Sequence, residues 1–286
     1  MSLKIKSNLL VKFKVIFIWV IGFSFGTVGQ TNTNVSARSI ALASCVATLK
    51  DMSVIQMNPS VLTDVKCLQI GLQNMSMTAM MDVQKNGAMV ALPIQKGVLG
   101  ISLQTFGNKV YRLFSGGVAY AMNISENLKL GVFLGDKNSS IQQYGSRNFI
   151  DVSLAIQGKL TDKITYGMCV QSLGVKSLEI QEANPTFLFV GIQYTSSKPN
   201  WRIYTEIEKS VISPVRLKIA CEYFVSPSFI FRTGLMTSSY QVSSGIGVWF
   251  KKRVRIDIGS SWQPVLGLAT QIGVNFSSKS KEKNEE

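Results

Sequence analysis

The chain has 286 residues, 46% of them hydrophobic, and a formal net charge of +14. It contains no histidine, which excludes a Cys/His metal site, a catalytic triad and histidine acid–base chemistry. Its Lys and Arg residues are scattered over predicted turns and polar strand faces instead of forming a stripe with interleaved aromatics, which argues against a nucleic-acid partner.

Residues 1–30 have the order of a secretory signal: a lysine-bearing start, an apolar run from Val15 to Phe25, and a small-residue stretch that ends at Gln30. The run is too short for a spanning helix. We expect cleavage near Gly29 or Gln30 and export of the mature chain. Loss of the four lysines in this segment takes the net charge from +14 to +10.

Residues 31–65 differ from the rest of the chain. The stretch 37–49 is apolar and rich in small residues with little clear period, which suits a short helix or a packed plug better than a wall strand. Asn58 and Pro59 follow as a turn signal, because the residue before a proline is pushed out of the α region. We interpret 31–65 as an N-terminal plug segment.

Residues 66–276 alternate between apolar and polar side chains, which indicates strands with one apolar and one polar face. Many of the strands have the length of about nine to eleven residues that a tilted strand needs to cross a bilayer. The sequence therefore predicts an all-β protein, a transmembrane antiparallel β-barrel of about 14 strands. The predicted strands are 66–74, 80–94, 97–106, 111–122, 126–136, 148–158, 162–171, 186–195, 200–208, 214–224, 227–236, 240–250, 253–262 and 266–276.

Two features orient this predicted barrel. With both termini periplasmic, the connections on that side are short, whereas the other side has two long loops, 137–147 and 172–185. Aromatic residues of the apolar phase gather near the short turns, as in an interfacial girdle: Tyr194, Trp201, Tyr223, Phe229, Phe250 and Phe276. Residues 277–286 then form a charged periplasmic tail, either merely solvated or a docking peptide.

The opposite face of the later strands is polar and charged, and we expect it to line the lumen. Its charged residues are Arg202, Glu206, Glu208, Arg216, Lys218, Glu222, Arg232, Arg255 and Asp257. We interpret them as a solvated interior wall whose charges pair with one another. A selectivity lining or a substrate site is the alternative.

Four cysteines occur, at positions 45, 67, 169 and 221. Cys169 and Cys221 lie on opposite strand faces, while Cys45 and Cys67 can meet only if the plug segment folds back. The spacings fit neither a disulfide framework nor a metal site, so we expect unpaired thiols and no cofactor.

The N-terminal segment resembles that of a known family. The stretch Ala37-Arg38-Ser39-Ile40-Ala41-Leu42-Ala43, then Val46-Ala47-Thr48-Leu49-Lys50-Asp51, then Asn58-Pro59-Ser60-Val61-Leu62 is similar to the plug motifs of FadL-like outer-membrane barrels, in particular the PorV/PorQ-like branch of Bacteroidetes associated with type IX secretion. The hairpin Val90-Ala91-Leu92-Pro93 with 97–102 is similar as well. The resemblance implies a 14-stranded barrel in the cell outer membrane with Asn58 and Pro59 in an internal plug, whereas the residues alone also fit a plain turn.

The motif departs from the family pattern because glycines expected around positions 42–44 are absent, and Ser60 and Val61 replace the usual Ala and Gly. Glycine permits close approach and positive φ, so we expect the plug to pack differently.

Three functions differ in how well the sequence supports them. A non-enzymatic PorV-like partner of an outer-membrane, type IX-like secretion assembly is favoured slightly over a FadL-like transporter for small hydrophobic compounds, because the predicted external loops offer no large apolar vestibule. An enzyme is disfavoured, since no nucleophile elbow, phosphate loop or convergent carboxylate pair is present. Expected partners are outer-membrane lipid and either a translocon protein or a hydrophobic small molecule.

Overall fold

The structure, a computed structural model, describes residues 36–78, 80–173, 185–196, 200–211 and 213–278. The predicted signal peptide, the first residues of the predicted plug, most of the loop 172–185 and nearly all of the charged tail lie outside these residues.

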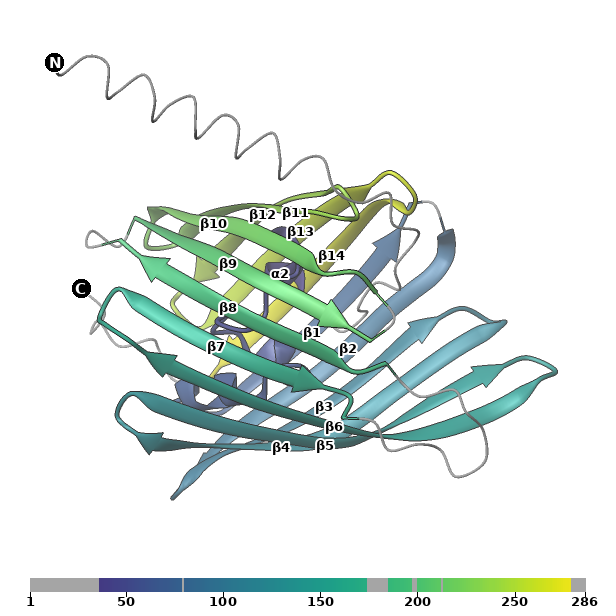
Figure 1. The fold of residues 1–286 in the computed structure, drawn as a ribbon, viewed down its shortest axis with the longest axis horizontal. Helices are drawn as coiled ribbons and strands as arrows, with labels where there is room; N and C mark the ends of the chain where they lie inside the picture. Colours follow the sequence, from purple (N-terminus) through teal and green to yellow (C-terminus); the bar gives the residue numbers. More distant parts are fainter. Residues whose placement is uncertain (1–35, 79, 174–184, 197–199, 212, 279–286) are drawn as a thin grey trace, which may run out of the picture.

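The described residues form a closed barrel of fourteen antiparallel strands, each paired with its sequence neighbours, and β1 pairs with β14 to close the ring (Figure 1). This confirms the predicted fold class. The strands are β1 (Gln69–Met77), β2 (Met80–Ile94), β3 (Gly97–Gly107), β4 (Tyr111–Ser125), β5 (Leu128–Ile141), β6 (Gly145–Lys159), β7 (Ile164–Gln171), β8 (Phe187–Thr195), β9 (Trp201–Ser210), β10 (Arg216–Ser226), β11 (Phe229–Met236), β12 (Gln241–Phe250), β13 (Val254–Gln263) and β14 (Gly267–Ser277).

Side-chain alternation explains why these segments form a barrel wall. In β9, Thr205 and Ile207 are exposed on the outside, while Glu206 and Glu208 are buried inside. Successive strand residues point to opposite faces, so a period of two puts all polar side chains of a strand on one side. Closure leaves no unpaired edge between β1 and β14, where nine residue pairs run from Gln69 to Met77.

The predicted loop 137–147 is wrong. β5 continues to Ile141 and β6 starts at Gly145, so only residues 142–144 form the turn. Polar side chains such as Ser139 and Ser140 lie on paired strands there. Because they do not alternate with apolar residues, the sequence pattern predicts a loop. The long-loop asymmetry that we used to orient the barrel therefore loses one of its two members.

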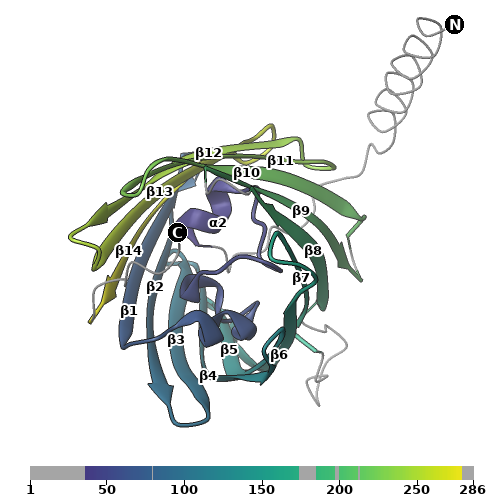
Figure 2. The same cartoon turned by 90° about the vertical axis from the view of Figure 1, so that its left-hand side faces the viewer.

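The plug lies inside the barrel (Figure 2). It comprises α2 (Ala37–Ala41) and two 3-10 helices, η1 (Met52–Val54) and η2 (Pro59–Asp64). The Ser36 side chain caps α2 by accepting a hydrogen bond from the Ser39 amide. All residues from 36 to 65 are buried except Ser44, Lys50 and Asp64. No helix among the described residues is long and apolar enough to cross a membrane.

Candidate functional site

The plug is held by carboxylates of the inner wall, beginning with Glu222 on β10. The Arg38 guanidinium of α2 donates from Nε and Nη2 to the two carboxylate oxygens of Glu222, at 2.8 Å each. Glu222 also accepts from Arg232 Nε and from the Tyr204 hydroxyl, both at 2.8 Å. All four side chains are buried. A two-point arginine–carboxylate contact fixes direction as well as charge, so α2 has a defined orientation against β10.

A second clamp holds the chain after α2. Glu206 Oε2 on β9 accepts from the backbone amides of Val46 and Ala47 at 2.7 Å each, and its Oε1 is 2.8 Å from Lys218 Nζ. Asn58 donates to the carbonyls of the same two residues, at 2.8 and 3.0 Å. Residues 46 and 47 are thus fixed on one side by the wall and on the other by the plug itself. Their backbone groups have partners although they lie outside regular structure.

The third contact joins the plug to β13. Asp51 Oδ2, at the start of η1, is 3.1 Å from Arg255 Nη2. Arg255 also pairs with Asp257, which pairs in turn with Arg232 at 2.8 Å. Burial acts to raise the pKa of Asp51, but the positive charges of Arg255 and Arg38 outweigh it and hold that pKa below its ordinary value. Asp51 is therefore ionised at neutral pH.

Glycines on the inner face of the wall give the plug backbone room to approach. A Cβ at Gly167 of β7 would overlap the Ala47 carbonyl, and one at Gly259 of β13 would overlap the Ala37 carbonyl. A Cβ at Gly131 of β5 would also overlap the Ser60 amide nitrogen. Because backbone atoms cannot rotate away as a side chain can, these three positions require glycine for the docked plug.

The plug backbone has an unusual conformation where glycines are missing from the family pattern. Ala43 and Ser44 have φ values of +52° and +60°, the left-handed region that glycine adopts without cost. The local backbone therefore has a shape that suits glycine, although the sequence has none there. The left-handed turn is thus present at these two positions, under strain, and a difference in packing from the family pattern stays a prediction.

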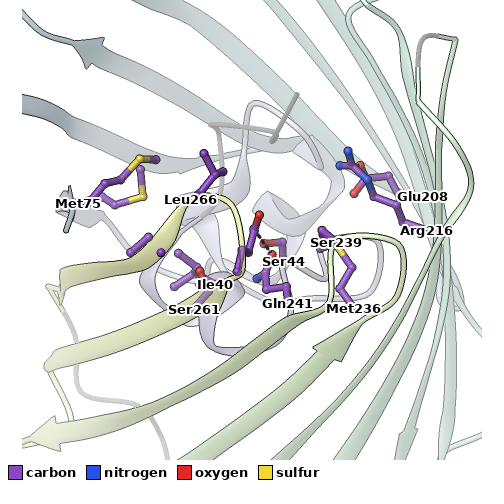
Figure 3. A pocket seen from close by; sticks show the side chains of 14 residues that line it. Ile40, Ser44, Met75, Glu208, Arg216, Met236, Ser239, Gln241, Ser261 and Leu266 are labelled. Carbon is purple, nitrogen blue, oxygen red and sulfur yellow. Dashed lines mark hydrogen bonds and ion pairs between the residues drawn. The ribbon is translucent and has the colours of Figure 1, made fainter. Parts of the chain in front are cut away.

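A cavity remains beyond the plug, at the end of the barrel away from Phe250 and Phe276. Its floor is formed by the plug residues Ile40 and Ser44 (Figure 3). Its wall combines methionines, amides and an ion pair: Met75, Met77, Glu208, Arg216, Met236, Ser239, Gln241, Ser261, Gln263, Leu266, Gly267 and Ala269. The cavity volume is about 60 Å³, enough for a few waters and below the roughly 150 Å³ of a cavity that holds benzene.

A larger groove of about 580 Å³ lies on the outer face of the wall, over β14 and β1 to β4. Exposed apolar side chains such as Leu72, Leu103 and Ile272 line it, with Asn74 and Asn86 hydrogen-bonded to each other at one end. It faces away from the plug and belongs to the outer surface.

The predicted lumen charges lie together inside the barrel. Eight of the nine are buried: Glu206, Glu208, Arg216, Lys218, Glu222, Arg232, Arg255 and Asp257. Arg202 is partly exposed, with its Nη1 3.9 Å from Glu222 Oε2. These residues pair with one another as expected, and some of them, such as Glu206, Glu222 and Arg255, also contact the plug. The expectation of a solvated wall is wrong, because nearly all of them are buried.

The other predicted residues fall into two places. Asn58 is fully buried in the plug, and Pro59 begins η2. The predicted girdle residues face outward near one end of the barrel: Tyr194, Tyr223, Phe229, Phe250 and Phe276 are exposed, and Trp201 is partly buried against Tyr194 with ring centroids 5.6 Å apart. All four cysteines lie in the described part of the chain and are free. The described residues contain no acidic or cysteine cluster suited to a metal ion.

Sequence reasoning missed Arg38, Asp51 and the wall glycines. A signal for the glycines was present, because Gly131, Gly167 and Gly259 all fall on the inward phase of their strands. Arg38 and Asp51 gave no periodic signal, since they lie in a segment without regular strands.

The fold resembles solved structures, although the sequence itself has no match. No family model and no curated protein matches the sequence. Solved structures do match. The CymD monoaromatic hydrocarbon channel has a TM-score of 0.66 at 11% identity, over 85% of this chain and 97% of that one. The Pseudomonas putida toluene transporter TodX has a TM-score of 0.64 at 12% identity, over 87% and 98%. A Pseudomonas aeruginosa FadL homologue has a TM-score of 0.66 at 9% identity, over 88% and 100%. The fold is therefore that of the FadL-like outer-membrane barrels.

Proposed function

We propose that this protein is a non-enzymatic channel for small hydrophobic compounds in the outer membrane. The observation that carries the proposal is a 14-stranded barrel that encloses a clamped plug beneath a methionine-lined cavity. The structural neighbours are named as hydrocarbon channels and toluene transporters, which supports this class of substrate. They give no support to the role in a secretion assembly that we favoured from the sequence, nor to its assignment to the PorV-like branch.

The chemistry of the cavity lining suits a transported hydrophobic compound. Met75, Met77 and Met236 supply flexible apolar surface that adapts to different shapes and contacts aromatic rings through sulfur. Gln241, Gln263 and Ser261 are polar groups that also line it. Since the cavity is smaller than a benzene site, the described conformation is closed, and passage requires the plug to leave its seat.

The outer-membrane location has a direct test. Folded outer-membrane barrels resist unfolding in detergent without heating, so boiled and unboiled membrane extracts should migrate differently on a gel. Equal migration together with recovery in the soluble fraction would reject the location.

Transport is tested by uptake of radiolabelled toluene into cells that express the protein, compared with cells that lack it. Leu266→Trp fills the cavity from the turn between β13 and β14, where Figure 3 places the side chain at the cavity wall. Val265→Trp, one residue away and exposed, is the matched control. We expect uptake to fall for Leu266→Trp and to stay unchanged for Val265→Trp. Uptake equal to that of cells without the protein would refute the proposal.

A further inference from the structure

One arc of the barrel rim carries five exposed cations. The turn between β12 and β13 contributes Lys251, Lys252 and Arg253, the approach to β1 contributes Lys66, and the turn between β2 and β3 contributes Lys96. These elements are neighbours, because β13 pairs with β14, β14 with β1, and β1 with β2. The Ser277 amide donates to the Arg253 carbonyl at 2.8 Å, which joins the turn to the β14 end of the arc. We call these five residues the basic arc.

No described acidic side chain pairs with the basic arc. The nearest acid in sequence is Asp64, and its carboxylate is paired with Lys129. The next turns along the rim each contain an acidic residue: Glu126 is exposed between β4 and β5, and Asp162 lies between Lys159 and Lys163. Within the described part of the chain, positive charge without an acidic counterpart is thus concentrated in this part of the rim.

The turn at the centre of the basic arc has lysines at two positions whose backbone conformation favours other residues. Lys251 and Lys252 have φ values of +46° and +54°, and the Arg253 amide donates to the Phe250 carbonyl at 3.0 Å. Two consecutive residues with positive φ define the hairpin turn that Asn-Gly fills with least strain. Lysine at both positions is strained, and such strain is a sign of a functional requirement for the side chains.

Outward-facing apolar side chains lie directly beside these cations. Phe250 precedes Lys251 and is 52% exposed, and Phe276, the register partner of Val254, is 42% exposed. Leu68 and Ile70 are exposed at the start of β1. Aromatic rings favour the level of the bilayer interface, and flexible lysines beyond them reach the phosphate level.

We propose that the basic arc binds the phosphate group of an anionic glycerophospholipid, whose acyl chains lie along the outer faces of β12 to β14 and β1. The lysine and arginine donors match the phosphate oxygens, and the exposed aromatic and aliphatic residues match the chains. The proposal requires that the barrel sits in a membrane, but it does not depend on what the barrel transports.

The test uses the full-length protein, purified in a non-ionic detergent and titrated with lipid under native mass spectrometry. The lipids are phosphatidylglycerol, phosphatidylcholine of the same chains, and lipid A. Lys251→Asn with Lys252→Gly removes two charges and installs the preferred turn, so a loss of binding is not a loss of folding. Lys159→Asn with Lys163→Gln, at another turn of the same rim, is the matched control.

We expect phosphatidylglycerol to bind in preference to phosphatidylcholine, and the turn variant to weaken it by at least about tenfold while the control keeps parent affinity. Equal affinity for the two phospholipids, or equal losses in both variants, would overturn the proposal. Preferential binding of lipid A that is lost in the turn variant would overturn the assignment to a phospholipid. Heat-dependent gel migration of each variant checks the barrel independently.

Discussion

Arg38→Gln should release the plug. The substitution removes two 2.8 Å hydrogen bonds to Glu222 and one of 2.7 Å to the Lys50 carbonyl. Removing one partner of a buried ion pair costs about 3 to 5 kcal/mol. Glu222 keeps Arg232 and the Tyr204 hydroxyl, so the lower end applies. About 3 kcal/mol corresponds to a roughly 100-fold larger population of the undocked plug.

The native thiol of Cys45 reports this population. Cys45 is 1% exposed in the plug, and burial raises the pKa of its thiol, so it reacts with a maleimide only when the plug leaves the wall. The measurement is the labelling rate in a background where Cys67, Cys169 and Cys221 are replaced by serine. Arg112→Gln, at an exposed position of β4, is the matched control.

We expect labelling of Cys45 to accelerate by about two orders of magnitude in Arg38→Gln and to stay unchanged in Arg112→Gln. An unchanged rate in Arg38→Gln would refute the claim that this ion pair holds the plug. The double variant Arg38→Gln with Glu222→Gln should lower the docking free energy of the plug by less than the sum of the two single changes. The reason is that the double variant leaves neither partner of the broken pair charged and buried.

Three further outcomes follow from the same contacts. Gly167→Ala should accelerate Cys45 labelling because its Cβ meets plug backbone, whereas Gly273→Ala, whose Cβ would lie 3.3 Å from the nearest side-chain atom, should have a small effect on the same rate. Ala43→Gly should slow labelling several-fold by relieving a left-handed residue worth roughly 1 to 2 kcal/mol. The pKa of Asp51 lies below its unfolded value, so its stabilising contribution is fully present above about pH 4 and is lost as the pH falls through the folded pKa; bilayer conductance should therefore rise only in acid, and Asp51→Asn should abolish that rise.

The barrel was predictable because a single local rule governs it. Strict alternation, as in Tyr240 to Phe250, indicates which face of each strand contacts an apolar environment. This rule requires no knowledge of distant contacts. It failed at residues 137–147, where the hairpin continues with polar side chains on both faces. Alternation marks only the part of a strand that separates two environments.

The contacts between the plug and the wall could not be predicted from a local pattern. Arg38 and Glu222 are 184 residues apart, and nothing local to either indicates the other. The inward charges were found by their phase, but their role as a seat depends on the plug that fills the lumen. Ala43 and Ser44 have positive φ although neither is glycine. Glycine is the preferred residue for that conformation, but its absence from the sequence does not exclude it.

The central claim is that compounds pass only when the plug leaves the wall, and a reversible tether tests it most directly. The Ser53 hydroxyl of η1 lies 3.3 Å from the Asn275 side-chain oxygen of β14, so Ser53→Cys with Asn275→Cys places two thiols across the plug and the wall. Toluene uptake is measured with the pair oxidised and again after reduction, with each single cysteine variant as control. We predict that oxidation stops uptake and that reduction restores it. Equal uptake in both states, with the crosslink verified, would contradict the account.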